Sequence, residues 1–433
     1  MNDAAYYADF HIHSRFARAT SRSLTLPLLD EFARKKGIQV LGTGDFTHPM
    51  WFAEIRHLLK PAPEPGLLVL KNAQSDDTTR FILSVEISSI YQQGGKGRRI
   101  HTLVMLPSLQ AVESFNKSLS GHGAKLSSDG RPMVGLSAKK IAELALAAHP
   151  QALVIPAHAW TPWFSVFGSM SGFDSLEECF EELTPRIPAI ETGLSSDPPM
   201  NWRLSQLDNV ALISSSDAHS PAKVGREATK FEGEMSYGAI GQALKFGAPG
   251  RAADGGQKAR LLGTIEFFPE EGKYHYDGHS AHKIRWHPKE TAANKGLCSV
   301  CNRRVTVGVL SRVEELADRP ADFKPAGAPG YWSLVPLEEI IAETLAVGVG
   351  TKKVAAAYEA LLQAFGNELA ILLDTPVEAL ESASSPMIAE AIKRVRAGKL
   401  QIEPGYDGEY GTVHVFSDQD RQAFGPAEQV SLF

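Results

Sequence analysis

The chain has 433 residues, of which 44 are Lys or Arg and 50 are Asp or Glu, so its formal net charge is −6. A hydrophobic share of 43% and a charged share of 22% exclude a mainly disordered chain, and the length suffices for two or three domains. The 3 cysteines exclude a disulfide scaffold, no apolar run approaches the roughly 20 residues that cross a bilayer, and the start of the chain lacks a signal-peptide pattern. We therefore expect a cytoplasmic protein without a membrane partner.

Short apolar runs in the first 250 residues repeatedly meet a histidine or an acidic residue. These runs are typical of strands, and helical patterns at 24–36 and 137–148 lie between them. About seven alternations of strand and helix predict an α/β barrel with a parallel sheet. The polar residues that end or open the runs are His11, His13, Asp45, His48, Glu86, His101, His158, Asp217 and His219.

Residues at the carboxyl ends of barrel strands converge on one mouth, so we expect these side chains to meet there. Neutral imidazoles and carboxylates are ligands for Zn²⁺, Mn²⁺ and Fe²⁺. A single histidine after a strand is more often an ordinary half-buried residue, but six histidines and three acids at equivalent positions favour a metal centre. His48 and His101 could each be outer partners of ligands instead.

The segment 274–301 has a different composition, with two pairs of metal-binding residues at two-residue gaps. The pairs His279/His282 and Cys298/Cys301 have the spacing of a closed structural zinc site. His275 and His287 are competing donors. The alternatives are a surface loop with a solvent-facing cysteine pair, and a redox Cys-x-x-Cys motif, for which no thioredoxin-like pattern surrounds the pair.

The motifs resemble the PHP (polymerase-and-histidinol-phosphatase) domain of metal-dependent phosphoesterases. This resemblance rests on residues 9–13, Gly44-Asp45, Glu86, His158 and 217–219. The resemblance is closer to the endonuclease Q family, PHP-type nucleases that cut DNA on the 5′ side of deaminated bases and abasic sites. It rests on the motifs at 11–16, 42–49, 215–220, 312–319 and 404–411, which span nearly the whole chain.

The resemblance implies a distorted (β/α)7 PHP barrel that holds two or three divalent ions, Zn²⁺, Mn²⁺ or Mg²⁺, and one structural zinc ion. It implies one site made by His11, His13, Glu86 and Asp217, a second made by Glu86, His101 and His158, and a third served by His219 with His48. Many PHP enzymes have another histidine a few residues after the first pair, and 14–18 contain none, so we expect two complete sites and a partial one.

Three carboxylates are the expected catalytic residues: Asp217, Glu86 and Asp45. Asp45 is either a ligand or an outer-shell base. Two metal ions suit phosphodiester hydrolysis because they stabilise both the attacking and the leaving oxygen and activate water. No cysteine nucleophile is needed, and we expect Cys179 to pack in the core. In the zinc motif, His282 stands where relatives look to have a cysteine.

Contacts to damaged DNA are expected from local basic clusters, because the net charge is acidic. The candidates are Arg98 and Arg99 beside a glycine-rich hairpin tip, and Lys352 and Lys353, which end the link 348–353 and begin the second of the helical patterns at 337–345 and 352–365. A further helical pattern lies at 388–397. Each cluster alone is more often a solvated face. Trp160, which follows His158, could stack on a base or pack the barrel rim.

The last residues form a polar segment that ends in Gln429-Val430-Ser431-Leu432-Phe433. This resembles the peptide that bacterial replication proteins insert into the sliding clamp. Leu432 and Phe433 would fill an apolar pocket while Gln429 anchors the extended backbone. A chance match of five residues is the alternative.

We therefore expect an α/β chain of four parts: the PHP barrel at 1–255, a zinc-binding domain at 256–325, a helical domain that contacts DNA at 326–415, and a flexible tail at 416–433. The expected function is metal-dependent DNA endonuclease activity on uracil, hypoxanthine, xanthine and abasic sites, in a nucleoid-associated repair enzyme. The alternatives are a phosphatase for a small phosphate ester and a non-catalytic DNA-binding or polymerase-accessory module.

Overall fold

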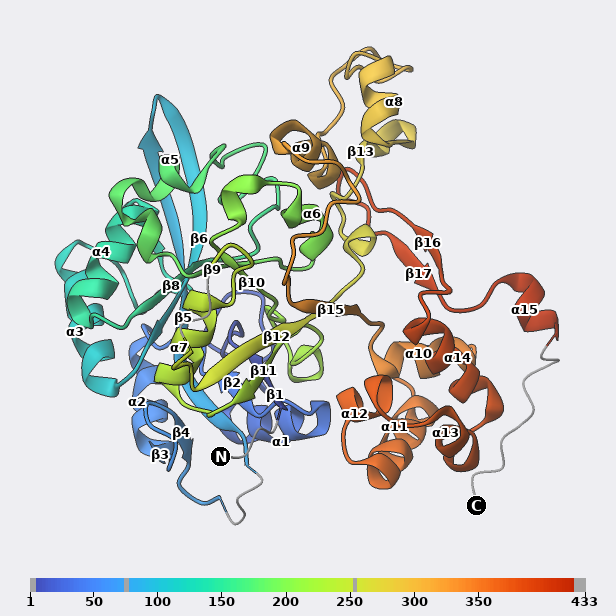
Figure 1. Ribbon diagram of the computed structural model, residues 1–433, viewed down its shortest axis with the longest axis horizontal. Coiled ribbons are helices and arrows are strands. Elements are labelled where there is room, and N and C mark those ends of the chain that lie inside the picture. Colours follow the sequence, from blue (N-terminus) through green and yellow to red (C-terminus); the bar gives the residue numbers. More distant parts are fainter. Residues whose placement is uncertain (1–4, 74–77, 252–254, 424–433) are drawn as a thin grey trace.

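The computed structural model describes residues 5–73, 78–251 and 255–423 (Figure 1). Helices surround a curved sheet in the larger part of the molecule, which the first two thirds of the chain build. A small module around α8 (Pro288–Ala293) projects from it, and a group of helices lies to one side (Figure 1). Every helix among the described residues is too short or too polar to span a membrane.

The main sheet follows from the short apolar runs of the sequence. Its strands are β1 (Ala5–Asp9), β2 (Val40–Gly42), β3 (Leu59–Pro61), β4 (Leu68–Leu70), β5 (Arg80–Gln93), β6 (Lys96–Leu106), β7 (Met133–Val134), β8 (Leu153–Pro156), β11 (Ala228–Gly233), β12 (Ala259–Glu266) and β15 (Gly330–Ser333). Their order is β15-β12-β11-β1-β2-β5-β4-β3, with β6 between β5 and β8 and β7 beside β5. β1, β2 and β5 run parallel to one another.

A second, parallel pair closes the barrel between β8 and β11. It consists of β9 (Ala189–Glu191) and β10 (Ala211–Ile213). The Ala159 amide donates to the Glu191 carbonyl at 2.9 Å, and the Ser214 amide donates to the Thr229 hydroxyl at 3.0 Å, which ties the pair to both neighbours. Apolar side chains fill the interior, among them Tyr6, Phe10, Ile82, Met105, Ile155 and Phe231. The centre of the barrel is therefore a packed core, and ligands can bind only at its ends.

The helices of the barrel are α1 (Leu26–Lys36), α2 (Pro49–Leu58), α3 (Leu109–Gly121), α4 (Ala138–Ala148), α5 (Leu176–Phe180), α6 (Pro198–Trp202) and α7 (Tyr237–Phe246). The helical patterns at 24–36 and 137–148 are confirmed as α1 and α4. α4 begins where the Ser137 hydroxyl accepts from the Lys140 amide, and α1 ends at Gly37, whose left-handed backbone suits a glycine.

β6 departs from the expected parallel repeat. It follows β5 directly and pairs with it in the antiparallel sense over a long hairpin that projects from the barrel (Figure 1). Gly94 and Gly95 make its two-residue turn, and both have positive φ, as a hairpin turn of this length requires. Because β6 runs in the opposite direction, its first residues lie at the same end of the barrel as the last residues of the parallel strands. His101, in the middle of β6, therefore reaches the mouth although it opens an apolar run in the sequence.

The sheet continues past both expected domain boundaries. β12 pairs with β11 on one side and with β15 on the other, so strands from before residue 255 and after residue 326 belong to it. The projecting module contains β13 (Asp277–His279), β14 (Ile284–Trp286), α8 and α9 (Val309–Leu316). The boundaries at 255/256 and 325/326 are therefore not where the barrel sheet ends.

The C-terminal region is helical, as expected. It contains α10 (Leu337–Thr344), α11 (Lys352–Phe365), α12 (Glu368–Leu373), α13 (Val377–Ala383), α14 (Pro386–Arg396), the hairpin of β16 (Gln401–Glu403) and β17 (Thr412–His414), and α15 (Asp418–Ala423). A buried ion pair at 2.5 Å joins Lys36 of α1 to Glu368 of α12. Glu368 also accepts from the Tyr358 hydroxyl at 2.8 Å and from the Leu337 amide at 3.1 Å. The helices are thus anchored to the barrel by a buried polar contact.

Candidate metal centre

Four side chains meet at the barrel mouth: His11 and His13 after β1, Glu86 from the middle of β5 and Asp217 after β10. Asp217 Oδ1 lies 3.0 Å from His13 Nε2 and 3.6 Å from His11 Nε2, and Glu86 Oε2 lies 3.4 Å and 3.6 Å from the same two nitrogens. Ligand atoms around one tetrahedral zinc ion are about 3.3 Å apart for bonds of about 2.0 Å. The spacing of the four atoms therefore fits a single metal ion.

Three of these ligand atoms are buried without a hydrogen-bond partner: His11 Nε2, His13 Nε2 and Asp217 Oδ1. Buried polar atoms are nearly always paired, and leaving one unpaired costs about 1–3 kcal/mol. Unpaired nitrogens and a carboxylate oxygen directed at one point are the donor set of a divalent cation. The residues present therefore fit the metal ion that the sequence predicts.

A second set shares Glu86 with the first: its members are Glu86, His101 and His158. Glu86 Oε1 lies 2.6 Å from His101 Nδ1 and 3.1 Å from His158 Nε2, and the two nitrogens are 3.1 Å apart. Glu86 Oε2 faces the first set and Oε1 the second. One carboxylate therefore links the two groups, which is the arrangement of a bridging ligand.

Each histidine is oriented by a partner on its other ring nitrogen. Glu191 Oε2 lies 2.9 Å from His11 Nδ1, and Asp45 Oδ1 lies 3.1 Å from His13 Nδ1. The second set has hydroxyl partners at 3.1 Å, Ser88 for His101 and Ser165 for His158. Such outer partners select the tautomer and the ring orientation of a metal ligand. All four metal-facing nitrogens are therefore positioned before any ion binds.

Three site residues at strand ends have left-handed backbone conformations, with φ of 49° at Asp45, 30° at His158 and 47° at Asp217. Non-glycine residues rarely adopt positive φ, and the strain concentrates at functional sites. The bend at each strand end turns the side chain into the mouth. The parallel contact of Ile12 with Ala218 then places His13 beside Asp217, although β1 and β10 are not neighbours in the sheet.

The electrostatics of the mouth favour a cation. Burial opposes ionisation of Glu86, but His101, Arg131 and His11 hold the pKa of this carboxyl well below its usual value. Burial likewise opposes protonation of His11, yet the nearby Glu191, Glu86 and Asp217 raise its pKa well above the usual range. Carboxylates that draw protons onto adjacent imidazoles also attract a divalent ion, and such an ion displaces these protons when it binds.

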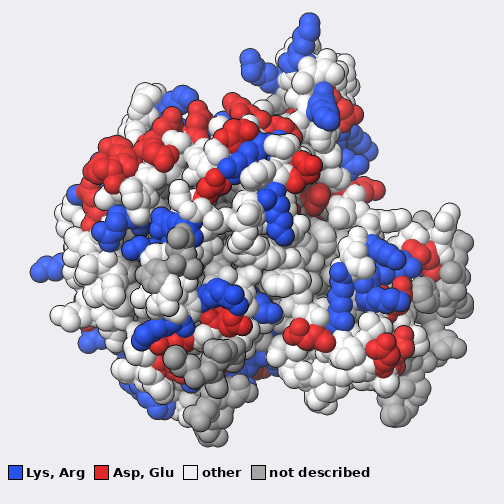
Figure 2. All heavy atoms as spheres, viewed as in Figure 1, with Lys and Arg blue, Asp and Glu red and all other residues white. Residues whose placement is uncertain are grey.

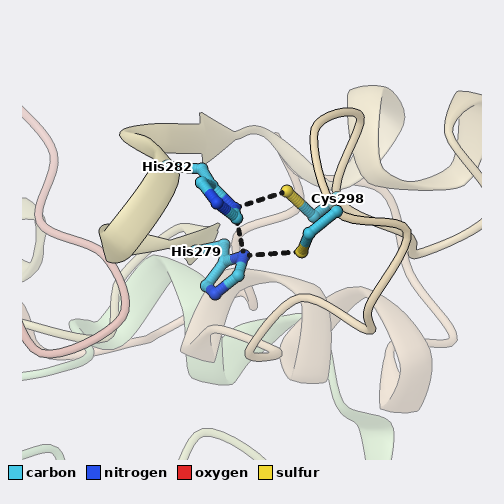
Figure 3. Close-up of side chains that lie close together, drawn as sticks. His279, His282 and Cys298 are labelled. Atoms are coloured by element: carbon cyan, nitrogen blue, oxygen red, sulfur yellow. Dashed lines mark hydrogen bonds between the residues drawn. The ribbon is translucent and has the colours of Figure 1, made fainter.

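A second cluster, in the projecting module, contains His279, His282, Cys298 and Cys301. His282 Nδ1 lies 3.4 Å from Cys298 Sγ, His279 Nδ1 lies 3.5 Å from Cys301 Sγ, and the two nitrogens are 3.1 Å apart. Figure 3 shows both rings directed at the sulfur side of the cluster. Tetrahedral zinc with bonds of about 2.0 Å to nitrogen and 2.3 Å to sulfur has ligands about 3.3–3.8 Å apart. The Cys2His2 group therefore fits a zinc site.

Two solved structures match nearly the whole chain. The crystal structure of the lesion-specific endonuclease PfuEndoQ from Pyrococcus furiosus has 30% sequence identity and a TM-score of 0.82, with 97% of this chain and 99% of that chain covered. A complex of endonuclease Q with a 27-mer duplex substrate that has an abasic lesion at the active site has 31% identity and a TM-score of 0.82, over 96% and 98% of the two chains.

The chain belongs to the endonuclease Q family.

Two sequence relatives match this chain to different extents. YqxK of Bacillus subtilis is 31% identical over 427 residues, which are 94% of this chain and 98% of YqxK. MJ0043 of Methanocaldococcus jannaschii is 32% identical over 264 residues, which are 59% of this chain and only 31% of MJ0043. Residues 336–399, the helices α10 to α14, match the family model of the MJ0043 C-terminal domain.

Three other predicted site residues of this chain lie outside the two ligand sets. Asp45 is an outer partner: it contacts His13, and its other oxygen accepts from the Ser14 amide and hydroxyl at 2.6 Å each. His219 lies at the rim, half-buried, with its ring 4.7 Å from that of His13. His48 is buried and stacks on Phe16 at 4.5 Å, and it belongs to neither ligand group.

Two of the predicted DNA contacts, Trp160 and Arg98, have buried side chains. The Trp160 side chain is 1% exposed, and its indole N–H donates to the Asn201 amide oxygen at 2.8 Å. Arg98 is 9% exposed, donates to the Gly172 carbonyl and lies over the Phe173 ring. Both residues are packed into the barrel, and for Trp160 this is the alternative that the sequence left open. Arg99, Lys352 and Lys353 are exposed, as a DNA contact requires.

Sequence reasoning missed Arg131 and Glu191. Arg131 donates to Glu86 Oε2 at 3.1 Å, and its half-buried guanidinium faces the mouth. No strand pattern precedes Arg131, so local sequence holds no signal for it. Glu191 accepts from the His158 amide at 2.9 Å as well as contacting His11. It ends the short apolar run 187–190, so the rule that found the ligands could have found Glu191 too.

The predicted clamp peptide, with Gln429, Leu432 and Phe433, lies outside the described residues.

Proposed function

We propose that this chain is a metal-dependent endonuclease that hydrolyses a DNA phosphodiester bond on the 5′ side of abasic sites and deaminated bases. The observation that carries the proposal is the pair of ligand sets that share Glu86 at an end of the barrel. Membership of the endonuclease Q family supports it, since a relative has been solved with an abasic duplex at its active site. The deaminated bases we have in mind are uracil, hypoxanthine and xanthine.

The residues at the barrel mouth have different roles in this proposal. Two metal ions held there would stabilise the attacking and leaving oxygens and lower the pKa of water. Asp217, His11 and His13 would hold one ion, His101 and His158 would hold the other, and Glu86 would serve both. The Arg131 guanidinium, beside Glu86, offers donors to a phosphate oxygen of the substrate. His219, half-buried at the rim, is our candidate for a partial third site, for which we also keep His48 in view.

In this proposal, exposed basic side chains bind the phosphates of the DNA. The projecting module presents Lys283, Arg285, Lys289, Lys295, Arg303 and Arg304. Figure 2 shows Lys and Arg gathered on the end of this module, while acidic residues form a band on the upper part of the barrel. Charges of this kind contact phosphates and make binding depend on salt. Arg99 on the β5–β6 hairpin and Lys352 and Lys353 at the start of α11 extend the contact.

Cleavage of defined duplexes tests the proposal. The protein is incubated with Mn²⁺, Mg²⁺ or Zn²⁺ and with duplexes that contain an abasic site, uracil or hypoxanthine, next to an undamaged duplex. Nicking of the damaged strand alone is expected. Release of phosphate from small esters without nicking, or binding without turnover, would overturn the proposal.

Asp217→Asn should lower the nicking rate by more than roughly a hundredfold, because loss of a ligand exceeds the 10–100-fold effect of outer partners. The melting temperature of the variant should stay close to that of the wild type. Asp322→Asn, an exposed position, is the matched control. An Asp217→Asn protein that cuts at the wild-type rate would rule out this residue as a ligand.

We also propose that the C-terminal peptide binds the bacterial sliding clamp and places the enzyme on the nucleoid in the cytoplasm. The support is the sequence pattern Gln429-x-x-Leu432-Phe433 alone. Deleting residues 429–433 should abolish binding to a purified clamp and leave nicking of a short duplex at its original rate. Unchanged clamp binding after the deletion would disprove the role of the peptide.

A further inference from the structure

The β8–α5 loop, residues 157–175, holds both histidines of the second ligand set. The His101 amide donates to the Phe164 carbonyl at 2.9 Å, and the rings of these two residues lie 4.6 Å apart. The Ser165 hydroxyl donates to the His158 carbonyl at 2.5 Å, so its oxygen can accept from His158 Nδ1 at 3.1 Å. This hydrogen bond leaves the other ring nitrogen, Nε2, for a metal ion. Two adjacent residues of one loop therefore position both histidines.

A buried arginine outside the loop joins two of its carbonyl groups. Arg312, in α9, is 7% exposed. Its Nε atom donates to the Phe167 carbonyl at 3.0 Å, and Nη2 donates to the Phe173 carbonyl at 3.1 Å. The other donors of the guanidinium reach Asp174 and Glu315, whose side chains are largely exposed. A planar guanidinium presents several donors at fixed angles, which a lysine cannot do.

The turn between these two carbonyls is tight and leads back to the metal ligands. The Gly172 amide donates to the Gly168 carbonyl at 2.8 Å, and a Cβ at Gly172 would lie 2.3 Å from the Gly168 amide nitrogen. At the base of the turn, the Phe167 amide donates at 2.9 Å to the carbonyl of Ala159, the residue after His158. Because the turn is closely packed, a shift of Phe167 is passed on to the segment that carries His158.

The helix α9 connects Arg312 to the projecting module. It packs against β13 and α8 of the module and against α6 of the barrel, and Figure 1 shows it between the two parts. The fully buried Asp277 of β13 anchors its start: the Gly308 amide donates to Oδ1 at 2.6 Å, and the Ser311 hydroxyl donates to Oδ2 at 2.5 Å. β13 ends at His279, a member of the zinc cluster. The position of Arg312 therefore depends on the module.

We propose that Arg312 is a positioning residue of the second ligand set, and that through it the projecting module controls how tightly the second metal ion is held. The inference rests on the two-ion centre of the proposed function. The histidines of the first set have carboxylate partners of their own, Glu191 and Asp45. Loss of the Arg312 guanidinium should therefore weaken binding of the second ion and leave the affinity for the first ion unchanged.

Binding of Mn²⁺ alone tests the proposal. Two Mn²⁺ ions that share a carboxylate couple magnetically, so electron paramagnetic resonance distinguishes the pair from an isolated ion. The full chain is dialysed against a weak chelator and titrated with Mn²⁺, which gives the dissociation constants of the first and second ions. The zinc content of each sample is measured alongside, because the module must stay intact.

Arg312→Met keeps an apolar stem and removes every donor. It should raise the dissociation constant of the second ion by roughly 10–100-fold relative to that of the first, as loss of an outer partner does. The signal of the coupled pair should weaken at the same Mn²⁺ concentration. Arg312→Lys keeps the cation but loses the fork of donors, so its ratio of dissociation constants should lie between those of Arg312→Met and the wild type.

Arg319→Met is the matched control. Arg319 follows shortly after α9 and also pairs with a carboxylate and a carbonyl, at Asp208 and Trp202, but these lie outside the β8–α5 loop. The change removes the same kind of anchor between α9 and the barrel. Arg319→Met should keep the wild-type ratio of dissociation constants and the coupled signal, even where its melting temperature falls.

Melting temperatures show whether the variants fold, and Arg312→Lys decides the test if Arg312→Met does not. A wild-type ratio in the folded Arg312 variants overturns the proposal, and so does an equal effect of Arg319→Met. A wild-type protein that binds the pair but nicks no duplex disproves the proposed function, while the ratio still decides the role of Arg312. A wild-type protein that binds no second ion overturns the proposal, and nicking of damaged duplexes would then still support the nuclease.

Discussion

At the residue scale, the metal centre depends on side chains that never touch the metal. Glu191 accepts from the His11 ring and from the His158 amide, so a single carboxylate orients one residue from each ligand set. It is fully buried and lies at the end of β9. A charged partner on the far nitrogen makes the facing nitrogen a stronger donor to the metal. We therefore regard Glu191 as a positioning residue of both sites.

Glu191→Gln should weaken metal binding by roughly 10–100-fold, because the amide keeps the shape but removes the negative charge. The measurement is the Mn²⁺ concentration at half-maximal nicking, together with the metal content of the purified protein. Nicking at saturating Mn²⁺ should recover most of the wild-type rate. The exposed Glu177→Gln is the control. A variant that needs no more metal than the wild type would show that Glu191 acts only on the fold.

At the element scale, the projecting module has little regular structure of its own. β13 and β14 have three residues each and α8 has six, too few to bury a sizeable core. Burial opposes ionisation of Cys298, but hydrogen bonds from His279 and His282 lower its pKa to about 6, which favours the thiolate that zinc requires. A zinc ion held by the four side chains is the element that can stabilise this module.

Cys298→Ser should release the structural zinc and make the segment 279–304 sensitive to proteases, while the barrel keeps its melting temperature. Limited proteolysis with mass spectrometry and a zinc assay measure the two effects. A chelator added to the wild-type protein should produce the same cleavage pattern. Ser299→Ala, at the exposed neighbouring position, should change neither result. Protease resistance in a zinc-free Cys298→Ser protein would contradict a structural role for the metal.

At the scale of the whole molecule, the helical region is fixed to the barrel through a buried ion pair. The Lys36 and Glu368 side chains are only 3% and 5% exposed. Pairs at the surface of the same junction, such as Lys35 with Glu359, are partly exposed and contribute less. Loss of one partner from a buried pair leaves an uncompensated charge, which costs more than the pair itself contributes.

Lys36→Met should reduce the free energy of unfolding by about 3–5 kcal/mol, because Glu368 is left buried without its cation. The double variant Lys36→Met/Glu368→Gln should regain a large part of this loss. Urea unfolding of the single and double variants measures both changes. Arg56→Met breaks an exposed pair with Glu113 and should cost less than about 1 kcal/mol. A double variant less stable than Lys36→Met would contradict the explanation.

Local sequence determined which residues gather at the mouth, because strand and helix periods depend on neighbouring residues alone, while the family resemblance divided them into two ligand sets. Apolar runs followed by His11, His13, Glu86, His158 or Asp217 predict strand ends at a common mouth, and both ligand groups assemble there. The spacing of the two His and Cys pairs predicts the second cluster for the same reason. Ser137 and Gly37 mark helix ends through hydrogen bonds and backbone conformations that involve only a few residues nearby.

Only the tertiary structure decided which polar side chains are exposed and which are buried and paired. The sequence offered Arg98 as a DNA contact and left Trp160 either a stacking surface or a packed residue. In the structure, Gly172 and Asn201, 74 and 41 residues away, pair with their polar groups. Arg131 donates to Glu86, which lies 45 residues away in the sequence. His275, although close to His279 in the sequence, does not belong to the zinc cluster. Burial and pairing depend on segments that approach only after folding, so no local pattern contains them. The sequence names the candidate metal ligands, while the packing of distant segments selects their partners.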